Sequence, residues 1–440
     1  MIHLTNTLTG KKEELVVTNQ LLLYVCGVTP YDDAHVGHGR CYVSFDVLNR
    51  VLRLSGIKVR YCRNFTDIDD KLLYRAQKEY DNRLRYHEIA QRYIDSFHRD
   101  MKALNCLSPD VEPRVTQSIP SIIVFIQKLI EKGIAYQSGN DVYYAIEKCP
   151  EYGKLSRQKI DDLHAGVRVD VREQKKNPLD FALWKGEPDG EFWYSPWGWG
   201  RPGWHIECSV MAHEYLGEHI DIHGGGLDLI FPHHENEIAQ SESLFGAPFS
   251  RIWMHNGLVM SNKEKMSKSL GNFFVLHELF KKYDPMVVRY YFLTHHYKAP
   301  LDFSYEGLDA AQKAYERLIR VFSASRSPLE ESSYHSDIVE QMYDFLRDDL
   351  NTPGMLGVVF DTIQEIAENA QELSAVKYIF VAVLGLTLEP LAEKKIEMTP
   401  EIHSLVNARH KARLEKNWAL ADQLRDQLQA LGVCVRDEKI

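Results

Sequence analysis

The pattern of apolar and polar positions in the first part of the chain predicts a strand, a helix and a second strand. A short apolar run at residues 21–26 leads into a glycine-rich stretch, and residues 40–55 then place apolar side chains at helical spacing before Gly56. Residues 57–62 form a second strand-like run, and another helix is predicted to begin near Asp70. Two strands joined by a helical crossover form a βαβ unit, so the chain is predicted to be an α/β protein with a doubly wound, Rossmann-like parallel sheet.

The pattern changes twice further along the chain. Residues 105–200 are irregular and rich in turns apart from a helix at 119–132, which indicates an insertion into the sheet domain. A strand at 219–223 and a helix at 232–243 continue the sheet domain, which is predicted to occupy residues 1–300. Residues 301–390 are helical in pattern and predict a helical bundle, and residues 391–440 form a small polar unit with its own helix.

Composition narrows the class of protein. The chain has 440 residues, 44% of them hydrophobic and 26% charged, which is typical of globular proteins. It has no apolar run long enough to cross a membrane and no secretory signal at Met1, so a cytoplasmic protein is expected. Seven cysteines at irregular spacing favour a reducing compartment over a disulfide framework. The net charge of −10 would by itself argue against nucleic-acid binding. Most of the acidic excess falls after residue 300, however, so the net charge does not exclude such binding.

The first candidate for chemistry is the turn His35-Val36-Gly37-His38-Gly39 between the predicted strand and helix. Glycines there would let a phosphate approach the backbone, where the helix N-terminus favours an anion. The two imidazoles would add hydrogen-bond donors that follow charge as it develops on the phosphate. Taken alone, the same residues also fit a polar turn with surface histidines.

The second candidate is the segment Lys265-Met266-Ser267-Lys268-Ser269, which is followed by Leu270, Gly271 and Asn272. Two lysines three residues apart can form a basic loop suited to pyrophosphate. A solvated basic loop is the alternative reading of a short charge run. The order of the two motifs along the chain makes a chance match harder to accept.

These two motifs resemble the defining motifs of the class I aminoacyl-tRNA synthetases, and four further segments resemble the cysteinyl-tRNA synthetase family in particular. The four are Tyr24-Val25-Cys26-Gly27, Asn64-Phe65-Thr66-Asp67-Ile68-Asp69-Asp70-Lys71, Arg201-Pro202-Gly203-Trp204-His205-Ile206-Glu207-Cys208-Ser209 and Phe231-Pro232-His233-His234-Glu235-Asn236-Glu237. The resemblance implies that L-cysteine is joined to tRNA(Cys) through an adenylate made from ATP with Mg²⁺. It also implies that residues 1–300 are catalytic and residues 391–440 bind the anticodon. The catalytic residues would be His35, His38, Lys265 and Lys268.

A metal site can be argued separately from the residue types. Cys26 at a strand end, Cys208, and a group of histidines and glutamates supply thiolate, imidazole and carboxylate ligands, a mixture that favours zinc. The residues alone leave the choice open among His205, His233, His234, Glu235 and Glu237, and isolated cysteines also serve as packing residues. The resemblance assigns one Zn²⁺ per chain to Cys26, Cys208, His233 and Glu237. Zinc would select cysteine over serine, because a pocket of mere shape separates such near-isosteres only ~10- to 200-fold.

Other substrate contacts are expected around the same sheet edge. The glycines Gly225 and Gly226 after the strand at 219–223 would permit close approach to adenosine, and Asp228 would accept from ribose hydroxyls, although a tight turn capped by an aspartate is the plainer reading. The resemblance adds Trp204 as a wall of the amino-acid pocket, together with Thr66 and Gly27.

Two basic segments are candidates for binding RNA. The first lies within residues 407–416, where Arg409 and Arg413 fall on one helix face, although a solvated helix face explains this segment equally well. The second is a run at Arg168, Arg172, Lys175 and Lys176. A monomer that does not bind membranes is expected. Two rival functions remain at this level. One is a ligase that passes activated cysteine to an amino sugar, and the other is a non-catalytic RNA- or metal-binding relative.

Overall fold

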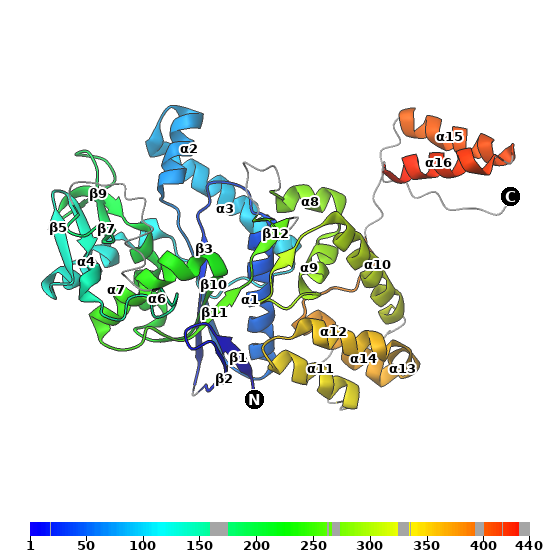
Figure 1. Ribbon diagram of the computed structural model, residues 1–440, viewed down its shortest axis with the longest axis horizontal. Coiled ribbons are helices and arrows are strands. Elements are labelled where there is room, and N and C mark those ends of the chain that lie inside the picture. The colour runs from blue at the N-terminus through cyan, green and yellow to red at the C-terminus, as the bar shows by residue number, and fades with distance from the viewer. Residues whose placement is uncertain are drawn as a thin grey trace. The chain divides into compact units, whose positions relative to one another are not determined.

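The computed structural model describes residues 1–17, 19–158, 175–261, 264–265, 273–323, 334, 336–391, 400–415 and 417–430 (Figure 1). Its internal contacts divide into two units, Met1–Glu389 and Pro390–Ile440, and each unit is considered by itself below. In the described part of the chain, every helix is too short or too polar to cross a membrane.

The centre of the first unit is a four-stranded parallel sheet, as the sequence predicts. Its strands lie in the order β11 (Ser250–Asn256), β10 (Ile220–Gly226), β3 (Leu21–Val28) and β4 (Val59–Phe65), and all three pairings are parallel. The helix α1 (Val36–Leu54) connects β3 to β4, which confirms the βαβ unit. The reversal of strand order between β3 and β10 is the switch point at which doubly wound proteins bind ligands.

Helix α1 begins earlier than the apolar spacing predicts. The expected start at residue 40 is replaced by Val36, because His35 is the N-cap and the histidine–glycine motif forms the first helical turn. The expected end is confirmed, since α1 stops at Leu54 and Gly56 follows with a φ of +76°. The next helix, α2 (Asp70–Tyr80), also begins where predicted, capped by the Asp69 side chain on the N–H of Lys71.

The insertion contains more regular structure than its irregular pattern indicates. After the helices α3 (Tyr86–Ala103) and α4 (Ile119–Glu131) comes an antiparallel sheet in the order β5 (Ala135–Ser138), β6 (Asp141–Tyr144), β7 (Phe181–Gly186), β9 (Gly198–Pro202) and β8 (Trp193–Ser195). These strands are too short for an alternating pattern to stand out in the sequence. The chain then returns to the parallel sheet through α6 (Trp204–Leu216), β10 and α7 (Glu235–Phe245).

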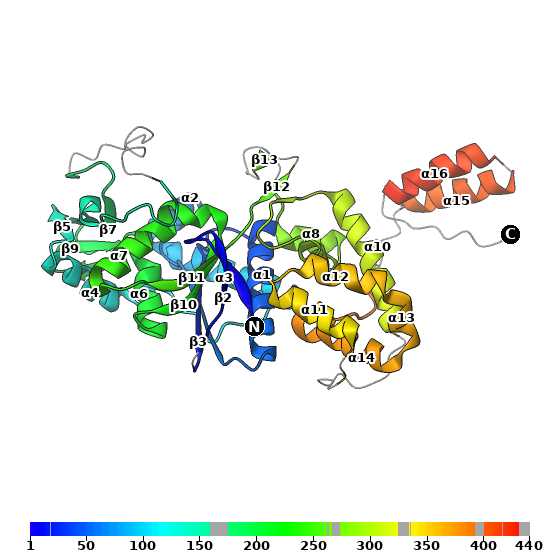
Figure 2. The same ribbon diagram turned by 60° about the horizontal axis from the view of Figure 1, so that its bottom comes forward.

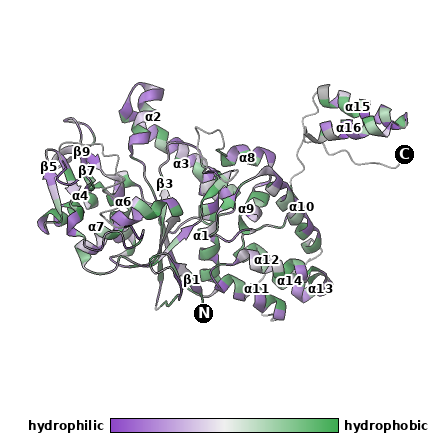
Figure 3. Ribbon diagram, in the orientation of Figure 1, coloured by the Kyte–Doolittle hydropathy of each residue, from purple (hydrophilic) through white to green (hydrophobic). Residues whose placement is uncertain are grey.

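The rest of the first unit is mainly helical, and the sequence predicted this for the part after residue 301. Figures 1 and 2 show these helices on the side of α1 away from the insertion, and Figure 3 shows hydrophobic and hydrophilic residues along each of them, as amphipathic helices require. They are α8 (Leu276–Lys282), α9 (Pro285–Leu293), α10 (Tyr305–Phe322), α11 (Asp337–Arg347), α12 (Thr352–Asp361), α13 (Ile363–Glu368) and α14 (Ala370–Tyr378).

Two small sheets of the first unit and the helix pair of the second unit complete the description. The strands β1 (His3–Asn6) and β2 (Lys11–Glu14) form a hairpin at the N-terminus. The strand β12 (Val259–Ser261) pairs with β13 (Glu264–Lys265) and β14 (Leu301–Asp302). In the second unit, α15 (Pro400–Leu414) packs against α16 (Trp418–Ala430) around Ile402 and Leu428.

A buried ion pair ties the helical part to the sheet domain. Arg289 on α9 is fully buried and pairs with Asp46 on α1. Its other nitrogens donate to the backbone oxygens of Leu384, at 2.6 Å, and Leu104, at 2.8 Å. One guanidinium therefore joins three separate parts of the chain.

We expect Arg289→Met to lower the free energy of unfolding by about 3 kcal/mol, because it leaves two buried carbonyl oxygens without their donor and removes one of the two guanidinium partners of the buried Asp46 carboxylate, which keeps Arg50. The shift in the urea unfolding midpoint measures this effect. The matched control is Arg347→Met, which removes a half-exposed guanidinium from a surface pair and should cost less than about 1 kcal/mol. Equal shifts for the two variants would show that the buried pair is not a main support of the fold.

Candidate functional site

A cavity of about 330 Å³ opens at the carboxyl ends of the parallel strands. Cys26 and Gly27 at the end of β3, Gly226 at the end of β10 and Asn256 at the end of β11 all line it. The first turn of α1 closes another side with His35 and His38, and α6 contributes Trp204 and Cys208. Residues as far apart in the sequence as 26 and 273 are thus brought to the edge of the sheet at which doubly wound folds bind ligands.

The two histidines of the first motif are held by the backbone. The N–H groups of Gly37 and His38 donate to Nδ1 of His35, at 3.1 and 3.3 Å, and the N–H of His35 donates to Nδ1 of His38, at 3.4 Å. The two rings stack with their centroids 3.6 Å apart. Because both Nδ1 atoms accept hydrogen bonds, the proton of each neutral imidazole must sit on Nε2.

Burial keeps these imidazoles neutral. It lowers the pKa of His35 to about 4 and holds the pKa of His38 well below its ordinary value, with the neighbouring His35 adding to the effect. At neutral pH both rings are therefore uncharged donors through Nε2.

The depressed histidine pKa values predict a loss of stability in acid. Burial lowers the pKa to about 4 for His35 and to about 3 for His205, His223 and His255. The unfolded chain takes up protons on these residues below about pH 6.5, whereas the folded chain does not until about pH 4. The contribution of these neutral histidines to the free energy of unfolding should be fully present above about pH 6.5 and be lost progressively as the pH is lowered toward 4. Calorimetric Tm values across that range will measure this loss. The variant His35→Asn should show a shallower fall, and an unchanged slope would contradict this assignment for His35.

A second set of buried side chains lies at the wall of the cavity. Cys26 Sγ is 3.7 Å from Cys208 Sγ and 3.6 Å from Glu237 Oε1, and His233 Nε2 is 3.1 Å from the same Glu237 oxygen. The ligand atoms of Cys26, Cys208, His233 and Glu237 all lie within 4.8 Å of one another. Burial raises the pKa of the Glu237 carboxyl and of the Cys26 thiol well above their ordinary values when no cation is present.

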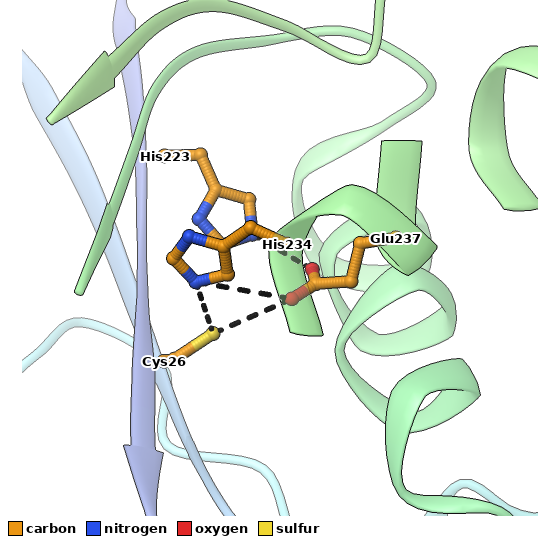
Figure 4. Close-up of side chains that lie close together, drawn as sticks. All are labelled: Cys26, His223, His234 and Glu237. Atoms are coloured by element: carbon orange, nitrogen blue, oxygen red, sulfur yellow. Dashed lines mark hydrogen bonds and ion pairs between the residues drawn. The ribbon is translucent and has the colours of Figure 1, made fainter. Parts of the chain in front are cut away.

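A second combination satisfies the same distance criterion: Cys26, His223, His234 and Glu237, shown in Figure 4. In this set, Cys26 Sγ is 3.3 Å from His234 Nε2, and His223 Nε2 is 2.8 Å from Glu237 Oε2. Both sets share Cys26 and Glu237 and differ in the other two ligands. His223 and His234 are fully buried and do not line the cavity, whereas Cys208 and His233 do.

Contacts outside the cluster also separate the two sets. His234 Nδ1 is 2.8 Å from His255 Nε2, and His255 in turn reaches Thr7, so the His234 ring is held from behind. His233 instead stacks on the Trp204 indole, with centroids 4.4 Å apart, and its Nδ1 is 3.0 Å from His205 Nδ1. The cluster that faces the cavity therefore contains Cys208 and His233.

The other residues expected around the amino-acid pocket occupy the cavity wall. Trp204 and Thr66 both line the cavity, and Thr66 Oγ1 donates to the buried Glu207 carboxylate at 3.0 Å. Gly27 is required by close packing, because a Cβ there would lie 1.4 Å from the Asn64 backbone oxygen. The Gly27 N–H donates to the Asn64 side chain at 2.9 Å.

The residues expected around the nucleotide divide into three groups. Gly226 and Asp228 line the cavity. Gly225 does not line the cavity. A side chain there would meet Leu229 and the His234 ring, so the absence of a Cβ at Gly225 serves internal packing. Lys265 lies in β13, while Lys268 and the rest of the basic motif lie outside the described residues.

Sequence reasoning missed the residues that support the site from behind. Asn64 accepts hydrogen bonds from Gly27 and from the Tyr24 hydroxyl, and His223 holds the second oxygen of Glu237. The sequence signal was present, since Asn64 closely follows the strand-like run at 57–62 and His223 ends the run at 219–223, but nothing in the sequence shows which strands are neighbours.

The basic residues expected to meet RNA are placed differently from expectation. Arg409 is only 6% exposed and Arg413 is half-buried, so these two do not form an open basic face on α15. Among the described residues of this two-helix unit, the hydrophobic core consists of Ile402 and Leu428 with Leu405 and Val406 packed against them. Arg168 and Arg172 lie outside the described residues, and Lys175 and Lys176 rest over the rings of Tyr143 and Tyr136.

Comparison with known proteins gives matches over both units. Residues 12–313 match the family described as tRNA synthetases class I (C) catalytic domain, and residues 396–439 match the cysteinyl-tRNA ligase anticodon binding domain. A cysteine–tRNA ligase of Persephonella marina is 45% identical, with 99% of this chain and 97% of the relative covered. That of Pseudomonas aeruginosa strain LESB58 is 46% identical, with 100% and 98% covered.

Solved structures share the fold at low sequence identity. A methionyl-tRNA synthetase of Mycobacterium tuberculosis has a TM-score of 0.58 at 15% identity and covers 92% of this chain and 96% of its own. The LeuRS of Agrobacterium radiobacter K84, in a ternary complex, has a TM-score of 0.63 at 10% identity, with 86% and 85% covered. With the family matches and relatives above 40% identity over nearly its whole length, the chain belongs to the cysteinyl-tRNA synthetase family within the class I aminoacyl-tRNA synthetases.

Proposed function

We propose that this chain joins L-cysteine to tRNA(Cys) in two steps, with a zinc ion selecting the substrate thiol. The observation that carries the proposal is that one cavity is lined both by the paired histidines of α1 and by the thiol and imidazole groups of Cys26, Cys208 and His233. The first group suits a phosphate and the second suits a sulfur-binding metal, so a molecule spanning both would carry a thiol at one end and a phosphate group at the other.

The residues present fit a zinc ion. Two thiols, one imidazole and one carboxylate form a soft, four-ligand set of the kind zinc prefers over magnesium or calcium. A buried glutamate beside two buried thiols is unfavourable without a cation, and a divalent ion would compensate for this. Cys26, Cys208, His233 and Glu237 would hold the ion, with His223 orienting Glu237. When bound, zinc would supply a site that deprotonates and ligates the cysteine thiol, which a serine hydroxyl does much less well.

In the first step, the cysteine carboxylate attacks the α-phosphorus of ATP and pyrophosphate leaves. His35 and His38 donate through Nε2 to the phosphate oxygens, on which charge grows in the transition state. Their Nδ1 atoms are already occupied by backbone N–H groups, so the donors are oriented before the substrate arrives. Trp204 bounds the amino-acid end of the cavity, and Asp228 accepts from ribose hydroxyls. Lys265 and Lys268 stabilise the leaving pyrophosphate, and Mg²⁺ accompanies ATP.

In the second step, a ribose hydroxyl at the 3′ end of tRNA attacks the carbonyl of the adenylate and AMP leaves. No covalent enzyme intermediate is required, so the residues of the cavity act by positioning and by stabilising charge. The small C-terminal unit would read the anticodon. That the chain works as a monomer in the cytoplasm stays a prediction.

The rival acceptor, an amino sugar, is not favoured. A ligase of that kind has no need of an anticodon-reading unit, whereas residues 396–439 match one. A non-catalytic relative would have no physical reason to keep the paired histidines and the metal-binding set intact.

One experiment separates the three possibilities. Purified protein is incubated with ATP and labelled cysteine, first with a tRNA pool and then with an amino sugar. We expect label on tRNA and none on the sugar. Label on the sugar alone would establish the rival ligase, and label on neither, without cysteine-dependent exchange of pyrophosphate into ATP, would establish a non-catalytic protein.

A further inference from the structure

Helix α2 presents an exposed face beside the mouth of the cavity. Lys71 in its first turn lines the cavity, and Tyr74 and Lys78 follow at intervals of three and four residues, so the three share one face of the helix. Tyr74 is 71% exposed, and both lysines are exposed. The opposite face, with Leu72, Leu73 and Ala76, is buried. In Figure 1, α2 stands at the top of the view, above the label of β3.

The charges around this face leave the two lysines available. The acidic neighbours Asp70 and Glu79 already have cations: Asp70 pairs with Lys185 and Arg201, and Glu79 pairs with Arg75 and Arg92. Asp69 caps the helix and Asp81 accepts from Gln77. Among the described residues, neither Lys71 nor Lys78 has a carboxylate partner, and Lys71 rests over the Tyr31 ring with its nitrogen 5.0 Å from the centroid.

An exposed aromatic ring between two available lysines suits single-stranded nucleic acid. An unpaired base can stack on the ring, while the lysines meet the flanking phosphates, and such stacking tolerates any base. A buried role does not account for Tyr74, since 71% of its surface is open. The same face begins at the cavity where the adenylate would form, so a strand lying along α2 would deliver its end to that cavity.

We propose that the Lys71, Tyr74 and Lys78 face of α2 binds the single-stranded 3′ end of tRNA, with Tyr74 stacking on an unpaired base. This inference rests on the proposed function and adds to it the path by which the acceptor end enters. Tyr74 and Lys78 do not line the cavity proposed to hold cysteine and ATP, so these two residues are expected to act in the transfer to tRNA and not in adenylate formation.

The test compares two reactions of the same variant. Tyr74→Ala should raise the KM for tRNA in cysteine charging about tenfold, within the range of one lost base stack, and leave cysteine-dependent ATP–pyrophosphate exchange unchanged. Tyr74→Phe should restore charging, because it keeps the ring. The matched control is Tyr194→Ala, which removes a tyrosine of similar exposure, 70%, on β8.

A binding cycle then identifies the part of the tRNA involved. Wild-type protein should bind intact tRNA more tightly than tRNA stripped of its single-stranded 3′ end, and Tyr74→Ala should bind both with the weaker affinity. The inference is overturned if Tyr74→Ala charges normally, if exchange falls as much as charging does, or if both tRNAs lose affinity equally. Failure of the proposed function looks different, since wild-type protein would then show no cysteine-dependent exchange at all.

Discussion

Cys208→Ser is expected to reduce bound zinc and to abolish most of the discrimination between cysteine and serine. The hydroxyl keeps the size of the side chain but is a harder and much weaker zinc ligand than a thiolate. Removing a mere supporting partner of a metal ligand typically costs 10- to 100-fold in metal affinity or activity, so loss of a direct ligand should cost about 100-fold or more in cysteine activation. Metal content by atomic emission and the ratio of kcat/KM values for cysteine and serine in pyrophosphate exchange give the two readouts.

The matched control is Cys149→Ser, the same substitution at a half-buried cysteine that belongs to neither metal-binding set. It should leave zinc content and selectivity unchanged. The variant also decides between the two sets, because Cys208 belongs to only one of them. If Cys208→Ser kept its zinc and its selectivity, the result would favour the other set found among the described residues, Cys26, His223, His234 and Glu237.

His35→Asn is expected to lower kcat for cysteine-dependent pyrophosphate exchange by about 100-fold with little change in the KM values. Asparagine is a favoured N-cap residue, and its side-chain oxygen can accept from the N–H groups of Gly37 and His38 as Nδ1 of His35 does. It has no group in place of Nε2–H, so the capping function survives and the donor to the phosphate is lost. Single-turnover formation of the adenylate and steady-state pyrophosphate exchange measure the loss.

The comparison that separates chemistry from folding is His35→Ala, which removes both functions. We expect it to be as slow as His35→Asn and also less stable, by about 1 kcal/mol, through loss of the cap. If His35→Asn were fully active and His35→Ala impaired, the histidine would serve α1 only as a cap, and its role toward the phosphate would have to be withdrawn.

The predictability of the fold differed between elements for identifiable reasons. The strand at β3 and the helices α2 and α4 could be predicted within a few residues because their apolar spacing and caps are local signals. The start of α1 was missed by four residues because histidine is an unusual N-cap and the glycines that follow hide the first turn. The short strands of the insertion could not be predicted, since β8 has three residues and, within the described part of the chain, pairs with β9 alone, which is also short.

The candidate site was predictable in its parts and not in its assembly. The amino-acid types at Cys26, Cys208, His233 and Glu237 indicated a soft metal, yet His205 and His234 offered equivalent imidazoles. The structure turns His234 back toward His255 and His233 toward the cavity and Trp204. Adjacent residues on one backbone thus face different surroundings, and only their packing partners distinguish them.

By itself, the sequence determined the class of fold, the family and the chemical character of the site, because helix caps, strand patterns and short motifs are encoded by neighbouring residues. The tertiary structure decided which of the candidates share a cavity. It brought Cys26 and Cys208 within 3.7 Å of each other, set Gly225 into packing, and buried Arg409 where an exposed RNA contact was expected. Contacts between residues far apart in sequence depend on which strands pair and which faces are buried, and that is settled only when the whole core packs.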